Sequence, residues 1–262
     1  GLVLEAVLRA GRILGPQDLA LAAAAGAGTL AVRRRLRVGV LSTGDELAQP
    51  GEGAGPAAVM DANRPMLLGL VEAWGMEAVD LGRAADRREA VRGALTQGAA
   101  RAEAVLTSGG ASAGDEDHVS AALAEAGSLG LWRVAMKPGR PMALGVWEGA
   151  GVFALPGNPV AAFVCALIFA RPALLALAGA DWAAPLGFEV PAGFAKRRKR
   201  GRREYLRARL GAGGRVEVFR SEGSGLISGL SWAEGLVELP EEGPDVAEGD
   251  PVRFLPFGSF GL

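Results

Sequence analysis

The chain has 262 residues, of which 50% are hydrophobic, and its formal net charge is −1. This size predicts one large domain or two smaller domains with real cores, and the near-neutral charge gives no general electrostatic reason to bind nucleic acid or a membrane surface. The single cysteine, Cys165, excludes an internal disulfide framework and a zinc site built from several cysteines. It lies in an apolar run typical of a core helix, so we expect a buried thiol; this run and the other long apolar runs are interrupted by Arg171, Pro172 or glycines, so no membrane span is expected.

The first 36 residues contain a short apolar segment and then an alanine-rich stretch. Pro16 and Asp18 predict the start of a helix, and Gly26 predicts its end, because proline in the first turn and glycine beyond the last are typical of helix termini. This segment is too small to bury a core alone, and the chain begins at Gly1 in the middle of a pattern. We therefore expect residues 1–36 to be the remnant of an N-terminal linker domain whose other part lies upstream.

Residues 37–180 alternate between predicted strands and predicted helices. Continuous apolar strands between amphipathic helices favour an α/β domain with a mostly parallel sheet, in which ligands bind at the carboxyl ends of the strands. The predicted strands are 38–41, 77–81, 104–107, 131–135, 142–146 and 152–155, and the predicted helices are 64–74, 87–102, 117–126 and 160–177.

Two of these helices have specific start signals. The stretch from Asp86 to Glu89 has the spacing of a capping box, with Asp86 as its first residue. Asp61 or Asn63 can cap the helix that Gly75 ends. Helix capping alone would therefore explain Asp86, without any chemical role.

Residues 181–262 have a different sequence pattern, in which short segments of alternating apolar and polar residues lie between glycine-rich turns. This pattern predicts a small all-β barrel or sandwich with strands near 188–190, 203–209, 216–219, 236–239 and 252–254. The basic tract 196–203 fits a solvated turn, and the alternative, a contact with nucleic acid, has only Tyr205 as an aromatic neighbour.

Four loops follow predicted strands of the α/β region and would meet at one rim of its sheet. Each also has an ordinary interpretation as a turn, and none matches the P-loop or the G-x-G-x-x-G fingerprint. Their coincidence on one rim favours a binding site. The loops are STGDEL (42–47), the stretch VLTSGGASAGDEDHV (105–119), MKPGRP (136–141) and LPGNP (155–159).

The residue types in these loops suit an anion. Gly109 and Gly110 would leave room for a phosphate or oxyanion against bare N–H groups, and Ser112 would add a hydroxyl. Lys137 and Arg140 would supply fixed positive charge, and the arginine can bind an anion through two parallel hydrogen bonds. A tight bend alone would also explain the two glycines.

Carboxylates beside an anion site suggest Mg²⁺, which prefers one or two carboxylates together with phosphate oxygens. Asp86 and Asp117 are the candidates, with Glu46 behind them. Residues 115–116 are interpreted as a solvated edge, and the lone His118 as a packing or surface residue.

Taken in order, these motifs resemble the molybdopterin molybdenumtransferase family, the group of MoeA and the gephyrin E-domain. The resemblance covers essentially the whole chain and includes several multi-residue motifs in register. The matching stretches are LSTGDEL (41–47), DANRPML (61–67), TSGGASAGDEDHV (107–119), MKPGRPMALG (136–145) and LPGNPVAAFV (155–164), with GRREYLRARL (201–210) and GLVELPEE (235–242) matching more loosely.

The resemblance implies a three-layer, MogA-like α/β domain at 37–180, followed by a small C-terminal all-β barrel at 181–262. It implies a cytoplasmic enzyme that inserts molybdate into adenylylated molybdopterin, releases AMP and uses Mg²⁺. It further implies a homodimer and a molybdopterin adenylyltransferase partner, with no nucleic acid and no membrane involved. In the family, the barrel and the α/β domain that form one pocket need not belong to the same chain.

The resemblance also implies roles for individual residues. The molybdate pocket falls on Lys137, Arg140, Pro141, Arg207 and Ser224. The expected catalytic residues are Glu46, Asp86, Asp117 and Lys137, the expected metal ligands are Asp86 and Asp117, and the other expected substrate-binding residues are Thr43, Gly109, Gly110, Ser112, Arg133, Pro156, Asn158 and Pro159.

Three departures from the family pattern stand out. Arg133 and Arg140 replace more usual lysines, and Ala161 replaces a serine that often follows the fourth loop. The upstream domain that helps to cover the pocket is missing from this chain, which we expect to weaken binding or activity. An adenylyltransferase-like activity and a non-catalytic molybdopterin-binding scaffold remain the alternatives.

Overall fold

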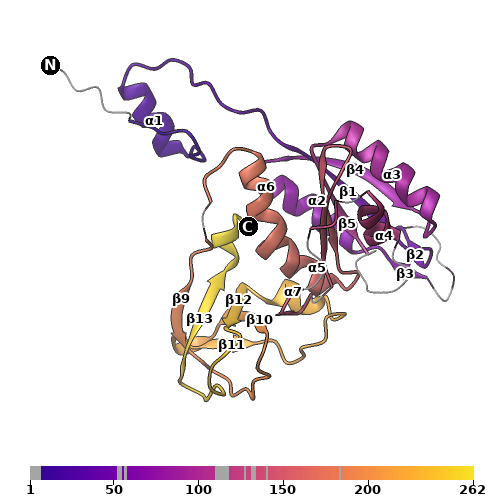
Figure 1. Ribbon diagram of the computed structural model, residues 1–262. Helices are drawn as coiled ribbons and strands as arrows, with labels where there is room; N and C mark the ends of the chain where they lie inside the picture. The colour runs from indigo at the N-terminus through magenta and orange to yellow at the C-terminus, as the bar shows by residue number, and fades with distance from the viewer. Residues whose placement is uncertain are drawn as a thin grey trace.

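The computed structural model describes residues 7–51, 55, 58–109, 118–126, 128–130, 134–139, 141–182 and 184–262. An α/β domain occupies the middle of the chain, and a β-rich domain follows it (Figure 1). Helix α1 (Pro16–Ala24) lies on an extended segment away from both (Figure 1). The predicted helix in this segment is confirmed, with proline in its first turn.

The central domain is built on a five-stranded mixed sheet with the order β4-β1-β5-β8-β7. Four strands run parallel, and the edge strand β7 runs antiparallel to β8. Their bounds are β1 (Arg37–Thr43), β4 (Glu77–Ala84), β5 (Ala104–Ser108), β7 (Ala143–Trp147) and β8 (Ala150–Leu155).

Helices cover both faces of this sheet. Successive residues of a strand point to opposite faces, so neighbouring residues of one strand pack against different helices. On β5, Leu106 packs in the cluster that contains α2 (Asn63–Ala73) and α5 (Pro159–Cys165). Its neighbour Val105 packs in the cluster that contains α3 (Arg88–Arg101) and α4 (His118–Glu125). The result is the α/β domain with a mostly parallel sheet that the pattern predicted, in the three-layer arrangement that the resemblance implied.

The capping prediction at Asp86 is wrong. The residue that precedes α3 is Arg87, and no side chain of the described residues forms a capping hydrogen bond at this helix start. The backbone N–H of Asp86 instead donates to Oδ1 of Asp45 at 3.0 Å, so Asp86 belongs to the loop.

The predicted helix 160–177 forms as three consecutive pieces. Between α5 and α6 (Arg171–Leu177) lies a π-helical turn, η1 (Ala166–Ala170). Pro172 has no N–H to bond the preceding turn, and the N–H of Arg171 reaches back five residues to Ala166, which is typical of such an insertion. Among the described residues this is the one stretch with the length and hydropathy of a membrane span, but 56% of its apolar window is buried inside the protein, as in a core helix.

The C-terminal domain is built on a sheet with the strand order β11-β10-β12-β13-β9. A bridge between Ala192 and Val216 joins its two edges and closes it into a small barrel around Leu206, Val237 and Phe254. The barrel prediction is confirmed, with β9 (Phe188–Pro191), β10 (Arg203–Leu210), β11 (Val216–Val218), β12 (Gly235–Leu239), β13 (Pro251–Pro256) and the short helices η2 (Ala212–Gly214), α7 (Ser228–Trp232) and η3 (Phe257–Phe260).

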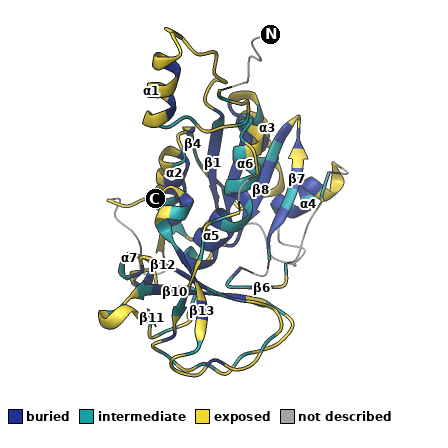
Figure 2. Cartoon of the chain, turned by 90° about the vertical axis from the view of Figure 1, so that its left-hand side faces the viewer, coloured by how far each residue is buried: buried dark blue, intermediate teal, exposed yellow. Residues whose placement is uncertain are grey.

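The predicted strand at 131–135 has a different outcome. Residues 131–133 lie outside the described part, and 134–135 are not in a strand. The strand that does form is β6 (Met136–Lys137), and it pairs with β10 of the barrel rather than with the α/β sheet. The two domains therefore share a sheet connection, and helix α5, which is almost wholly buried, lies between the sheet and the barrel (Figure 2).

Candidate functional site

The carboxyl ends of the parallel strands form a rim on which the first, second and fourth loops meet. The strand register places Ser42, Ser108 and Leu155 in one row across β1, β5 and β8. The N–H of Gly109 donates to the carbonyl of Leu155 at 3.1 Å. Gly109 has a φ of +90°, and a Cβ there would lie 2.9 Å from the backbone oxygen of Thr43. Close packing of two loops thus requires this glycine whether or not an anion binds there.

Asn63 ties the second and fourth loops together, a role that the sequence did not indicate. Its Nδ2 donates to Oγ of Ser108 and to the carbonyl of Gly157, both at 2.7 Å. The residue is only 6% exposed, and its Oδ1 has no hydrogen-bond partner among the described residues. A buried amide oxygen without a partner is unusual and is available to a ligand donor.

The sequence did single out Asn63, but only as one of two candidates to cap the helix that follows it. Asp61 performs the capping instead, since its Oδ1 accepts the N–H of Arg64 at 3.1 Å and its Oδ2 accepts the hydroxyl of Ser42 at 2.5 Å. Asp61 therefore caps the helix, and Asn63 does not. The side chain of Asn63 instead forms the contacts across the rim.

The predicted carboxylates of the first loop and of β4 lie exposed near this rim. Asp86 follows β4, and its N–H is bonded to Asp45 in the first loop. The carboxylate of Glu46 folds back against Gly44, and the carbonyl of Glu46 pairs with Val59 in the short ladder of β2 (Leu47–Ala48) and β3 (Val59–Met60). No group of three metal-ligating side chains occurs in the described ranges.

The third loop does not join the rim as predicted, because β6 carries Lys137 to the barrel, beside the Arg207 with which the family resemblance groups it. The register pairs Lys137 with Glu204 of β10, so the third loop faces the barrel and not the rim of the α/β sheet. The correction has a physical reason: the pairing partner lies 67 positions further along the chain, and no local pattern in MKPGRP indicates it.

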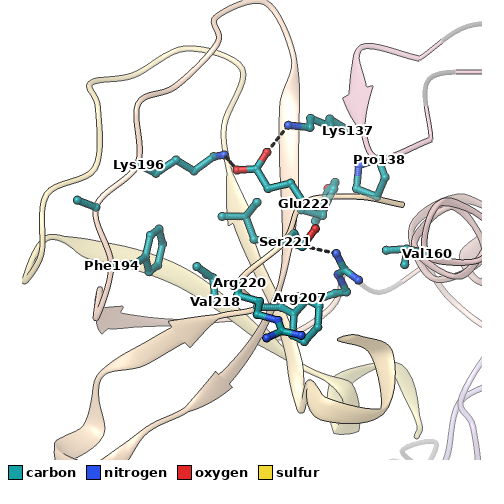
Figure 3. Close-up of a pocket in the computed structure, with 14 residues that line it drawn as sticks. Lys137, Pro138, Val160, Phe194, Lys196, Arg207, Val218, Arg220, Ser221 and Glu222 are labelled. Atoms are coloured by element: carbon teal, nitrogen blue, oxygen red, sulfur yellow. Dashed lines mark hydrogen bonds and ion pairs between the residues drawn. The ribbon is translucent and has the colours of Figure 1, made fainter. Parts of the chain in front are cut away.

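Around Lys137 the two domains bring together two lysines and two glutamates. The Nζ atoms of Lys137 and Lys196 lie 3.7 and 3.3 Å from Oε2 of Glu204, and both also form ion pairs with Glu222 (Figure 3). Burial opposes the charged form of Glu222, but the two ammonium groups outweigh it and lower its pKa to about 2.

Arg207 forms another wall of the same cavity, which has a volume of about 190 Å³. Its terminal nitrogens donate to the carbonyls of Ser221, Gly223 and Leu226, and its guanidinium lies 4.8 Å from the ring centre of Phe219. Burial lowers the pKa of Arg207. Arg207 thus supplies charge to the cavity while it holds the backbone of the loop at 221–226.

The rim and the cavity meet at the first turn of α5. Asn158 precedes this helix and Pro159 begins it, with the buried Pro156 just before them in the fourth loop. The next residue, Val160, lines the cavity, and its N–H donates to the carbonyl of Ser224 at 3.1 Å.

The structure therefore brings the predicted residues together in two adjoining groups. Thr43, Gly109 and Asn158 belong to the rim, and Lys137, Arg207 and Ser224 belong to the cavity or its wall. Pro141 follows Lys137 by four positions in the chain and does not line the cavity. Glu46 and Asp86 lie on the exposed side of the rim. The predicted residues Gly110, Ser112, Asp117, Arg133 and Arg140 lie outside the described part of the chain.

Comparisons with known proteins agree with this architecture. Residues 39–176 match the family of the probable molybdopterin binding domain, and residues 189–257 match the MoeA C-terminal region, domain IV. The molybdopterin molybdenumtransferase of Haemophilus influenzae is 34% identical over 258 residues, which are 97% of this chain and 64% of that protein. Molybdopterin molybdenumtransferase 2 of Mycobacterium tuberculosis is 36% identical over 255 residues, which are 94% of this chain and 63% of that protein.

Solved structures give the same result. The molybdopterin biosynthesis MoeA protein of Pyrococcus horikoshii superposes with a TM-score of 0.78 and 27% identity, over 96% of this chain and 61% of that one. A molybdenum cofactor biosynthesis protein of Pyrococcus furiosus gives a TM-score of 0.75 and 26% identity, over 96% of this chain and 79% of that one. The chain spans somewhat less than two thirds of the two curated relatives, and it belongs to the MoeA-type molybdopterin molybdenumtransferase family.

Proposed function

We propose that this protein inserts molybdate into adenylylated molybdopterin, with release of AMP, as a molybdopterin molybdenumtransferase. The observation that carries the proposal is the cavity in which Lys137 of the α/β domain faces Arg207 and Lys196 of the barrel. Fixed cations in a partly buried pocket favour a small anion of high charge, since their charges need no rearrangement when it binds. Molybdate, a tetrahedral dianion, fits this description.

The adjoining rim suits the phosphate end of the pterin substrate. Thr43 and Ser108 are buried hydroxyl residues there, which can donate to phosphate oxygens. Oδ1 of Asn63, which has no partner among the described residues, can accept a hydrogen bond from an N–H or hydroxyl group of the substrate next to the phosphate. The first turn of α5 connects the rim to the cavity, so one extended ligand can contact both. Positioning and charge complementarity would then account for most of the rate.

Mg²⁺ fits the exposed side of the rim. Asp86 and Glu46 offer hard oxygen donors beside the phosphate side of the site, and Mg²⁺ takes only one or two carboxylates when substrate oxygens complete its shell. We assign the ion to Asp86 and Asp117, with Glu46 nearby. When bound, it would neutralise charge on the phosphoanhydride, while Lys137 and Arg207 orient the oxyanion.

The proposal includes action in the cytoplasm as a homodimer, with substrate delivered by a molybdopterin adenylyltransferase. The match of residues 189–257 to the MoeA C-terminal region favours the transferase over an adenylyltransferase-like activity. A non-catalytic scaffold is the second alternative, and molybdate-dependent turnover in the experiment below would exclude it.

The test is AMP release from adenylylated molybdopterin, with and without molybdate, in the presence of Mg²⁺. We expect molybdate-dependent AMP release and a loss of at least about tenfold, or about 1.4 kcal/mol, in Lys137→Gln. Lys199→Gln, which changes an exposed lysine of the basic tract 196–203, is the matched control and should leave the rate unchanged. AMP release that depends neither on molybdate nor on Lys137 would refute the proposed transferase activity. Pyrophosphate release from ATP and molybdopterin would support an adenylyltransferase activity instead.

A further inference from the structure

The carboxylate of Glu222 occupies the position between the two cavity lysines. Its Oε2 faces Nζ of Lys137 and its Oε1 faces Nζ of Lys196, so each carboxylate oxygen serves one ammonium group (Figure 3). Two oxygens of a tetrahedral oxyanion can contact the same two ammonium groups. Glu222 therefore stands where the proposed substrate would bind.

Burial separates the permanent members of this cluster from the removable one. The side chain of Glu204 is 2% exposed and that of Lys196 is 10% exposed. Oε2 of Glu204 has no hydrogen bond among the described residues, so the nearby ammonium of Lys196 is its main compensation. Separating this pair would leave a buried charge alone, which is strongly unfavourable.

Glu222 has no such constraint, since its side chain is 47% exposed. Its backbone is fixed on both sides, because Arg207 binds the carbonyls of Ser221 and Gly223. Rotation of the side chain alone would move the carboxylate into solvent, where its charge is hydrated. An incoming anion can thus replace Glu222 without disturbing the loop.

We propose that Lys196 is the second cation of the oxyanion site and that Glu222 is an internal competitor that a tetrahedral dianion displaces. The proposal rests on the proposed function and adds a selection by charge. The two lysines and two glutamates are neutral as a set. Exchange of the singly charged carboxylate for a dianion strengthens the attraction to both lysines, whereas exchange for a monoanion gains little.

The experiment is isothermal titration of the 262-residue protein with sodium molybdate and with perrhenate, a tetrahedral oxyanion of single charge. We expect wild type to prefer molybdate, and Glu222→Gln to bind molybdate about tenfold more tightly. Lys196→Gln combined with Glu204→Gln, which removes the buried pair without leaving an unpaired charge, should bind at least about tenfold more weakly.

Matched controls are Glu248→Gln, from an exposed ion pair with Arg215, and Lys199→Gln, and neither should change the dissociation constant. Thermal unfolding of each variant verifies the fold. Unchanged or weaker molybdate binding in Glu222→Gln overturns the inference, as does unchanged binding in the Lys196 and Glu204 double variant. If Lys137→Gln still weakens binding, the proposed function survives that result; if neither wild type nor Glu222→Gln binds molybdate, both fail.

Discussion

At the level of single residues, Gly139 shows what holds the third loop in place. Its φ is +102°, and a Cβ there would lie 2.3 Å from Sγ of Cys165. Cys165 is buried on α5, as the sequence predicted, and burial raises its pKa to about 12. The motif KPGRP alone was compatible with a plain solvent turn. The structure explains its glycine by packing against the helix that separates the two domains.

We therefore expect Gly139→Ala to destabilise the protein by about 2–4 kcal/mol, since it combines a left-handed backbone with overpacking against a rigid helix. Urea unfolding at pH 7 measures the difference. Gly149→Ala is the control, because its φ is +87° but no atom of the described residues lies within 4 Å of the added Cβ. It should lose only about 1 kcal/mol. Equal losses in the two variants would contradict the packing explanation.

At the level of elements, the sequence predicted most strands and helices because their hydrophobic periods are local and strong. The sequence-based prediction failed where a residue or strand is positioned by a partner that lies far away in the chain. Strand β6 forms because β10 is available, and Asn63 is held by Ser108 and Gly157, which are 45 and 94 positions away. The four loops could therefore be found from motifs, and the grouping of Lys137 with Arg207 and Ser224 came only from the family resemblance. The cluster of Lys196, Glu204 and Glu222 was not predicted.

Glu103 fixes the starts of two neighbouring strands, and its effect should depend on pH. It accepts the N–H of Arg37 at 2.9 Å, and side-chain hydrogen bonds from Arg37 and Arg34 lower its pKa from 4.5 to about 2. A lowered carboxyl pKa gives stabilisation that is complete above about pH 5 and is lost as the pH falls toward 2.

We expect Glu103→Gln to lose about 1 kcal/mol at pH 7, a value reduced by the exposure of its arginine partners. The deficit relative to wild type should shrink as the pH is lowered from 5 to 2. Unfolding curves across this range, with Glu248→Gln as the control, provide the measurement. A deficit that stays constant down to pH 2 would show that the ion pairs are not its cause.

At the level of the whole molecule, the barrel completes a site that the α/β domain begins. Strand β6 joins the barrel sheet, and Val160 of α5 bonds Ser224 of the barrel, so the third and fourth loops both end against the second domain. Each domain contributes cations to the cavity, Lys137 from one side and Lys196 and Arg207 from the other. Loss of the barrel should therefore abolish oxyanion binding even if the α/β domain keeps its fold.

The central claim is that this shared cavity binds the oxyanion, and a crystal soaked in sodium molybdate tests it most directly through anomalous scattering at the molybdenum edge. We predict one dominant peak between Lys137 and Lys196, beside Arg207, with the carboxylate of Glu222 turned out of the cavity. A dominant peak on the rim at Thr43 and Gly109, with Glu222 still bridging the two lysines, would contradict the claim.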